Sequence, residues 1–299
     1  MTLRQKQRQF TTGPIKTIAA MSVAALALAG CNTDSSGTMS LDITDAPVDS
    51  ALEVNVVFDG VDIHSARGNL IEITYDEPRS INLLDYQGGA TASLLDDEWL
   101  PAGDYQWISL RVDATKEAGG SNILLDDGSD YDLYVPSGDE TGLKLVQGFT
   151  VPVNGSVAFT IDFDLRKSVV EEDGTGFYKL RPALRLVDNT QVGSIAGPVD
   201  SNTLTADCSG AVYVYEGENV TPGDVGGNGV EPIVTALVDT DDSGVTKFDY
   251  KVAFLTEGDY TAAFTCGAAQ DDPEGADTLT FIDPQNASVV ANQSVTINF

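Results

Sequence analysis

The chain has 299 residues and a formal net charge of −30 at pH 7, because 46 acidic residues stand against only 16 basic ones. A charge of this size repels the phosphates of nucleic acid, which excludes that class of partner. Hydrophobic residues make up 42% of the chain, which predicts folded cores rather than disorder. The acidity fits either solubility in salty surroundings or the collection of cations such as calcium.

Residues 1–30 have the order of a secretory signal peptide. They contain four basic residues (Arg4, Lys6, Arg8 and Lys16) and no acidic residue, followed by an apolar run over 17–30. This run is shorter than the roughly 20 residues that a membrane-spanning helix needs. We therefore expect residues 1–30 to be removed on export.

The signal ends in Leu28-Ala29-Gly30-Cys31, which resembles the lipobox of bacterial lipoproteins. The resemblance implies that the Cys31 sulfur receives a diacylglyceryl group and that the freed amine receives a further acyl chain such as palmitate, which together anchor stably. Residues 31–38 would then be the lipidated cysteine and its tether. Asn32 favours outer-membrane sorting in this family, on the periplasmic or the surface face. The alternative is an ordinary signal peptide that happens to contain a cysteine.

Removal of the signal leaves 12 basic against 46 acidic residues, or a net charge of −34. It also leaves Cys208 and Cys266 as an even pair in an oxidising compartment, where a disulfide is expected. This bridge would contribute roughly 4 kcal/mol by restricting the unfolded chain. Redox or haem motifs of the CxxC type are absent from the sequence.

Alternating apolar and polar residues predict short strands over the first domain, residues 39–190. The expected strands are 39–44, 52–58, 70–75, 107–113, 122–125, 131–135, 155–163 and 183–187. Turn-forming pairs separate them at Asp59-Gly60, Gly68-Asn69, Asp127-Gly128 and Asn154-Gly155. Residues 81–99 instead predict one or two short helical turns around a Gly-Gly pair.

A second domain is predicted over residues 191–299. Its expected strands are 193–197, 210–215, 230–239, 246–254, 260–266, 278–282 and 294–299, with a glycine-rich loop at 222–229. Many short strands at this spacing are typical of a β-sandwich, so the chain is expected to be all-β, with two sandwich domains of immunoglobulin-like or transthyretin-like layout.

Two local patterns occur in both domains. The segment 100–105, LPAGDY, is similar to 255–260, LTEGDY, and the segment 156–163, SVAFTIDF, is similar to 294–299, SVTINF. The first pattern predicts a glycine-centred turn that precedes a strand, and the second predicts a closing strand. Either the two domains share a layout, or strand-rich segments resemble one another by chance.

Several motifs in the first domain, in this order, resemble the bacterial domain of unknown function 4382. They are SLDITDAP at 40–47, INLL at 81–84, the 100–105 turn, VPSG at 135–138, GLKL at 142–145, DFDLRKSV at 162–169 and LRPALR at 180–185. That family implies no activity. The second domain resembles, more weakly, the transthyretin-like and carboxypeptidase-regulatory sandwiches, which are structural or binding modules.

Half of the basic residues of the mature chain fall within residues 144–185. The candidate ligand-binding residues among them are Lys144, Arg166, Lys167, Arg181 and Arg185. Together they would bind an anionic group such as a carboxylate or a sugar acid. In the alternative interpretation they pair with Asp162, Asp164 and other acids nearby.

Two acidic turns are candidate calcium sites, because calcium prefers oxygen ligands. The first offers Asp126, Asp127, Asp130 and Asp132. The second, 239–244, begins like an EF-hand loop, but Tyr250 occupies its twelfth position in place of Glu, so the motif fails. Both stretches lie between expected strands, so solvated hairpin turns are the preferred interpretation. Apart from calcium, no cofactor is expected.

Signatures of an enzyme are missing from the sequence. His64 is the only histidine, no Gly-x-Ser-x-Gly motif is present, and a zinc site lacks ligands. The sequence thus predicts a non-enzymatic binding or structural module of the envelope, with carbohydrate, peptide or another envelope protein as partner. Two alternatives remain, a calcium-dependent adhesion or matrix component and a hydrolase that uses two carboxylates.

Overall fold

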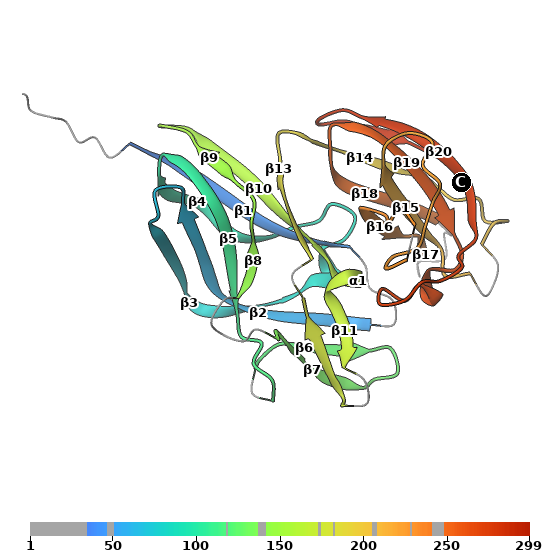
Figure 1. Ribbon diagram of the computed structural model, residues 1–299, viewed down its shortest axis with the longest axis horizontal. Coiled ribbons are helices and arrows are strands. Elements are labelled where there is room, and N and C mark those ends of the chain that lie inside the picture. Colours follow the sequence, from blue (N-terminus) through green and yellow to red (C-terminus); the bar gives the residue numbers. More distant parts are fainter. Residues whose placement is uncertain are drawn as a thin grey trace, which may run out of the picture. The chain divides into compact units, whose positions relative to one another are not determined.

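The computed structural model describes residues 35–46, 51–117, 119–136, 142–172, 175–181, 183–204, 208–227, 229–240 and 248–299. The signal peptide and Cys31 lie outside these residues. Residues 34–299 form one compact unit. It contains four sheets that make two β-sandwiches, so the expectation of an all-β fold is confirmed (Figure 1).

The first sandwich packs a four-stranded sheet against a nine-stranded one. The smaller sheet has the order β13 (Leu184–Asp188), β10 (Ser156–Asp164), β1 (Ser36–Ala46), β4 (Ala92–Pro101). The larger sheet has the order β11 (Val169–Glu172), β12 (Phe177–Leu180), β7 (Asp130–Tyr134), β6 (Asn122–Leu125), β2 (Ala51–Ser65), β5 (Gly103–Val112), β8 (Leu143–Leu145), with β3 (Leu70–Asn82) beside β2 and β9 (Phe149–Val151) beside β5. A 3₁₀ turn, η1 (Leu83–Tyr86), and a one-turn helix, α1 (Leu165–Ser168), complete it.

The period-two pattern of the sequence explains the core of this sandwich. Met39, Leu41 and Ile43 of β1 are fully buried, and so are alternate residues of β2 such as Val54 and Val56. Successive side chains of a strand point to opposite faces, so each sheet offers one apolar face to the other.

The second sandwich packs two four-stranded sheets. One has the order β17 (Asp239–Thr240), β18 (Phe248–Thr256), β14 (Val192–Pro198), β21 (Ser294–Thr296), and the other β16 (Val234–Leu237), β15 (Ala211–Glu216), β19 (Gly258–Thr265), β20 (Phe281–Val289). A short 3₁₀ turn, η3 (Ala268–Gln270), follows β19. Ile195, Val212, Val252 and Phe264 form part of its separate core.

The two sandwiches share a strand-pairing scheme. In the first, β1 pairs in parallel with β10 and antiparallel with β4. In the second, β14 pairs in parallel with β21 and antiparallel with β18. The strands that follow also correspond, because β2 pairs with β5 as β15 pairs with β19. The sequence similarities between the two domains therefore reflect a common layout.

The repeated glycine-centred turn is built in the same way in both sandwiches. Tyr105 is buried and donates its hydroxyl hydrogen to the carbonyl oxygen of Pro101 at 2.7 Å. Tyr260 is buried likewise and donates to the carbonyl oxygen of Thr256 at 2.7 Å. Each tyrosine thus fastens the start of its strand to the end of the preceding one.

Four of the sequence predictions of local structure are wrong in part. Residues 92–101 form strand β4 in place of the second helical turn, although η1 provides the first turn. Asp59-Gly60 does not turn the chain but lies inside β2, at a shift of register where Gly60 approaches Ile73 closely. The strand predicted at 278–282 is β20, which runs over 281–289. The predicted strand 230–239 is divided between β16 and β17, which belong to different sheets.

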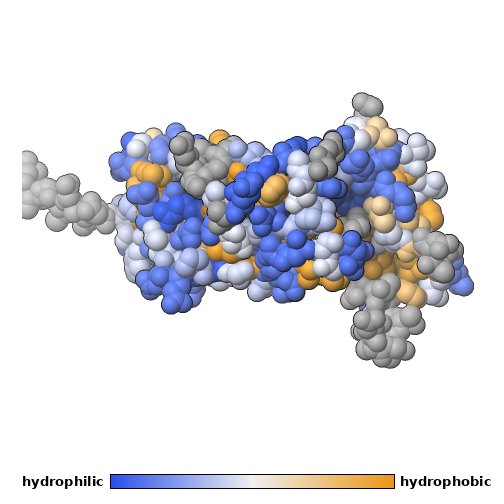
Figure 2. Space-filling view, turned by 90° about the horizontal axis from the view of Figure 1, so that it is seen from below, coloured by the Kyte–Doolittle hydropathy of each residue, from blue (hydrophilic) through white to orange (hydrophobic). Residues whose placement is uncertain are grey.

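The disulfide between Cys208 and Cys266 is confirmed, with Cα atoms 4.5 Å apart. In the part of the chain that the structure describes, no helix is long and apolar enough to cross a membrane. On the face shown in Figure 2, hydrophilic residues cover most of the surface, and hydrophobic residues appear between them in small groups.

Candidate functional site

The candidate site is a wedge between strands β16 and β18. Next to it, Asp239 and Thr240 of β17 pair with Asp249 and Phe248 of β18. Strand β16, which directly precedes β17, does not continue this pairing with β18. It pairs instead with β15 of the opposite sheet. One continuous segment therefore belongs to two sheets, and the two strands diverge where it crosses from one to the other.

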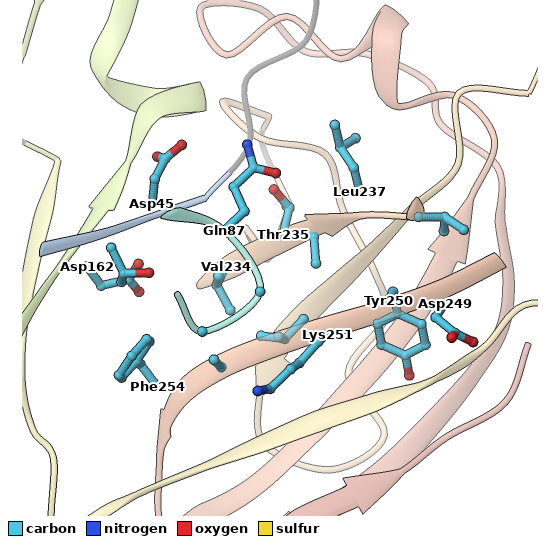
Figure 3. Close-up of a pocket in the computed structure, with 17 residues that line it drawn as sticks. Asp45, Gln87, Asp162, Val234, Thr235, Leu237, Asp249, Tyr250, Lys251 and Phe254 are labelled. Atoms are coloured by element: carbon cyan, nitrogen blue, oxygen red, sulfur yellow. The ribbon is translucent and has the colours of Figure 1, made fainter. Parts of the chain in front are cut away.

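A cavity of about 480 Å³ occupies this wedge (Figure 3). Its walls include every residue of 234–238 on one side and every residue of 249–254 on the other. Since alternate residues of a strand point to opposite faces, a wall made of consecutive residues presents the edge of the strand. Edges carry backbone N–H and C=O groups that can pair with another chain.

Residues from the first sandwich also line the cavity. Thr44 and Asp45 come from the end of β1, Gln87, Gly88 and Gly89 from the turn after η1, and Asp162 from β10. In Figure 3 Asp45 and Asp162 lie on one side of the cavity, while Lys251, Tyr250 and Asp249 follow one another along β18.

The polar side chains of the wedge differ in how far their hydrogen-bonding groups are satisfied. Thr235 is 5% exposed, and its hydroxyl has no hydrogen-bond partner among the described residues. By contrast, Thr44 donates to the carbonyl oxygens of Tyr86 and Ala90, both at 2.8 Å. Tyr250 donates to the carbonyl oxygen of Ile297, and burial raises the pKa of its hydroxyl. The unsatisfied Thr235 hydroxyl is the kind of group that a bound ligand satisfies.

The five candidate ligand-binding basic residues do not meet in one pocket. Lys144 lies over the ring of Trp107 at 4.0 Å. Lys167 contacts Asp164 and Glu231, and Arg181 contacts Glu274 at 2.9 Å. Arg185 forms an ion pair with Asp162. Lys167 and Arg185 thus contact the acids named in the alternative interpretation, whereas Arg181 pairs with a distant acid and Lys144 packs on an aromatic ring. Only Arg185 borders the wedge, through Asp162.

Arg166 has a different environment, because it is 2% exposed. Its guanidinium donates to the hydroxyl of Tyr213 and lies 3.4 Å from a carboxylate oxygen of Asp271. Tyr213 also donates to Asp271 at 2.5 Å, and the backbone N–H of Val225 donates to the same carboxylate. Burial raises the pKa of the Asp271 carboxyl, against the opposing hydrogen bonds and the guanidinium. A buried arginine bound in this way is a structural group.

The candidate calcium residues Asp126, Asp127, Asp130 and Asp132 lie in and beside the β6–β7 hairpin turn. Asp127 accepts from the backbone N–H of Ser129 at 2.8 Å, which lowers its pKa, and Asp130 accepts from Asn122. These are the contacts of a solvated turn. Of the second acidic turn, 241–244 lies outside the described residues.

Within the described residues a different acidic cluster forms, made of Asp224, Asp271 and Asp277. Its members come from distant segments, so no local sequence pattern predicts it. One of the three, Asp271, is already bound by Arg166 and Tyr213. The cluster is therefore partly neutralised by a guanidinium, which competes with a cation.

His64, the only histidine, is stacked on Trp107 with ring centroids 4.8 Å apart. Among the described residues, the buried Nδ1 atom of its ring has no hydrogen-bond partner. A stacked, half-buried position of this kind is typical of a histidine that packs on a sheet surface.

One known protein family matches most of the first sandwich. Residues 36–182 match the family model described as "Domain of unknown function (DUF4382)". The resemblance of the first domain to this family is thereby confirmed. No curated protein matches the chain.

Among solved structures the similarities are weak. The minor pilin GBS52 of Streptococcus agalactiae has 10% identity and a TM-score of 0.22, over 87% of this chain and 94% of that chain. A putative cell adhesion protein from Parabacteroides distasonis has 12% identity and a TM-score of 0.23, over 89% and 93%. The Bacillus anthracis TIE protein has 11% identity and a TM-score of 0.23, and 88% of this chain aligns with 34% of its length.

Proposed function

We propose that this protein is a lipoprotein of the bacterial cell envelope that binds an extended polypeptide segment and performs no catalysis. Cys31 carries the lipid in this proposal, in the outer membrane, on its periplasmic or surface face. Residues 39–190 and 191–299 act as two modules, the second of transthyretin-like layout, and the wedge of the second module is the binding site.

One observation carries the choice of ligand. The wedge is bounded by the edges of two diverging strands, 234–238 and 249–254. In the described part of the chain, β16 pairs with β15 alone, and β18 pairs with β14 and with the two residues of β17. An extended peptide supplies backbone donors and acceptors to such edges, and pockets along them select its side chains.

The site has little that could perform hydrolysis. A glycosidase needs two carboxyl groups placed on either side of the bond, one of them free to donate a proton. Three carboxylates of the described residues line the wedge: Asp162 is ion-paired with Arg185, Asp45 is buried, and Asp249 is exposed. The polar groups of the wedge are better suited to holding a ligand.

The proposal can be tested by a substitution that places a large side chain in the cavity of the wedge. Ala253 lines the cavity and is half buried, so Ala253→Trp would occupy part of the volume. Ala269, which is exposed on η3, provides the matched control Ala269→Trp. The mature chain is applied to an array of peptides that covers the secreted proteins of the source cell.

We expect the parent and the Ala269→Trp control to bind a common set of peptides that Ala253→Trp fails to bind. Equal binding by all three chains would place the peptide elsewhere and contradict the proposal. If the chain binds glycans rather than peptides and Ala253→Trp abolishes that binding, the wedge remains the binding site but the proposed ligand class is wrong.

The calcium-dependent alternative is favoured by one observation, the cluster of Asp224, Asp271 and Asp277. Calorimetric titration of the mature chain with calcium separates it from the peptide-binding proposal. We expect neither heat of binding nor a change in melting temperature. A saturable heat that Asp277→Asn abolishes would instead support an adhesion or matrix component that depends on calcium.

A further inference from the structure

The start of strand β1 is surrounded by turns of the first sandwich. The backbone N–H of Ala102 donates to the carbonyl oxygen of Ser35, and that of Asn154 donates to Ser36. The adjoining 65–70 turn is joined to the same end, since the N–H of Ala66 donates to Asp104. This end of the sandwich is therefore the place where the chain enters from its N-terminal segment.

Large apolar side chains are exposed at this end. Trp99 on β4 is 71% exposed, and Val153 in the turn before β10 is 58% exposed. Trp99 pairs with Thr38 of β1, and Thr38 pairs with Ser156 of β10, so these positions lie in one row across the sheet. Leu70, at the end of the neighbouring turn, is 49% exposed. We call Trp99, Val153 and Leu70 the apolar rim.

Exposed tryptophan side chains have a preferred location at a membrane surface. Its ring is apolar, while its N–H donates a hydrogen bond, so tryptophan is enriched where lipid headgroups meet water. In the described residues Trp99 is the only aromatic side chain among the exposed large hydrophobic ones. Its exposure has no explanation within the sandwich, since it covers no part of the core.

The covalent chain limits how far this end can be from the anchor. Five peptide steps join Cys31 to Ser36. A fully extended chain spans at most about 3.6 Å per residue, so this segment reaches no more than about 18 Å in any conformation. A lipid on Cys31 would thus hold the apolar rim within a short distance of the headgroups.

We propose that the apolar rim rests on the bilayer that carries the Cys31 anchor, with the Trp99 ring in the headgroup region. The inference depends on the lipid anchor of the proposed function. The occupant of the rim is a zwitterionic phospholipid surface, because a mature chain with 46 acidic and 12 basic residues is repelled by anionic lipid. Arg67, exposed in the 65–70 turn, is positioned to pair with a lipid phosphate.

The experiment uses Trp99 as its own reporter. The chain has two tryptophans, so Trp107→Phe leaves Trp99 as the sole indole. It also has three cysteines, two of which form the disulfide, so the mature chain has a single free thiol at Cys31. This thiol is coupled to maleimide-phosphatidylethanolamine in phosphatidylcholine vesicles that contain lipids with brominated acyl chains.

We expect the emission of Trp99 to shift to shorter wavelength and to be strongly quenched once the chain is coupled. The matched variant Trp99→Phe keeps only Trp107, which is stacked on His64 and beneath Lys144. Its emission should change little. Exposed Trp99 can be replaced without disturbing the core, and circular dichroism of both variants confirms that they fold.

Unchanged Trp99 emission in the coupled protein would overturn the proposal. A blue shift that appears without vesicles and grows with protein concentration would also overturn it, in favour of a second copy of the chain on the rim. Artificial coupling does not depend on native lipidation. If Trp99 emission responds in the coupled protein but the native protein carries no lipid, the anchor is refuted and the rim proposal stands. If the native protein carries the lipid but Trp99 emission does not respond, only the rim proposal is refuted.

Discussion

At the scale of single residues, the most unusual group is the buried trio of Arg166, Tyr213 and Asp271. Two of its members are ionisable side chains withdrawn from water, which costs free energy unless they bind one another closely. The hydrogen bonds of Tyr213 and of the Val225 backbone help to satisfy the carboxylate. Removal of one partner leaves the other buried without compensation.

The pKa of Asp271 predicts a pH dependence of stability. Burial raises it above the ordinary value of 3.8, so at intermediate pH the folded protein binds more protons than the unfolded chain. The contribution of this group is fully present below pH 3.8 and is lost as the pH rises through the raised pKa. Asp271→Asn removes this titration. Urea unfolding of both chains from pH 4 to pH 7 should show the advantage of the parent over the variant shrinking as pH rises. An advantage that grows with pH would contradict the assignment.

The two buried tyrosines make a second residue-scale prediction. Tyr105→Phe and Tyr260→Phe each remove a hydroxyl that donates to a carbonyl four residues earlier. Each change should lower the free energy of unfolding by about 1 kcal/mol, the net value of a typical hydrogen bond. Equal losses are expected because the two contacts correspond. In urea unfolding, a loss at only one of the two positions would show that they do not.

At the scale of elements, the closing turns of the two sandwiches correspond as closely as the tyrosines. Asn154 and Asn292 precede β10 and β21, with φ angles of 53° and 60°. Each donates its backbone N–H to the first strand of its sandwich, to Ser36 and to Val192. Asparagine tolerates the left-handed region better than most residues.

Asn154 allows a test of this turn, because its side chain is exposed. A β-branched residue is strained at positive φ, so Asn154→Val should cost about 1–2 kcal/mol of unfolding free energy. Asn154→Gly is the matched control and should cost nothing measurable, since glycine adopts this conformation freely. Thermal or urea unfolding compares the three chains, and equal stability of the valine variant would disprove the strain.

The disulfide links the start of β15 to the end of β19 in the second sandwich. It spans 58 residues, so Cys208→Ser with Cys266→Ser should lower the free energy of unfolding by about 4 kcal/mol in the chain-entropy view. Urea unfolding with and without reductant measures the loss. A parent protein that is unaffected by reductant would contradict it.

Elements with clean alternation were predictable from the sequence, such as β1, where the buried Met39, Leu41 and Ile43 alternate with polar residues. Strand β4 was not, because its register shifts near Leu95 and the positive φ of Asp97 interrupt the period of two. Strands of three or four residues, such as β8 and β11, are too short to show a pattern. The wedge depends on one segment that changes sheets, which no local pattern records.

At the scale of the whole molecule, the chain forms two β-sandwiches, and the family model matches residues 36–182 of the first. The basic residues around 144–185, which local sequence suggested as a pocket, bind separate acidic partners. Lys251, which lines the wedge, had no distinguishing signal. The surroundings of each of these residues depend on contacts between segments that are distant in the sequence.

The proposed anchor predicts a change of location. Cys31→Ser removes the sulfur that would carry the lipid, and the remaining chain is strongly acidic. We expect this variant to leave the membrane fraction of the source cells and to appear in the soluble fraction. The parent protein in the same fractionation is the control. Retention of the variant in membranes would require another means of attachment.

The most direct measurement is the mass of the N-terminal peptide of the protein isolated from its native envelope. We expect this peptide to begin at Cys31 and to carry a diacylglyceryl group and a further acyl chain. A mature chain that begins at another residue and carries no acyl mass would contradict it.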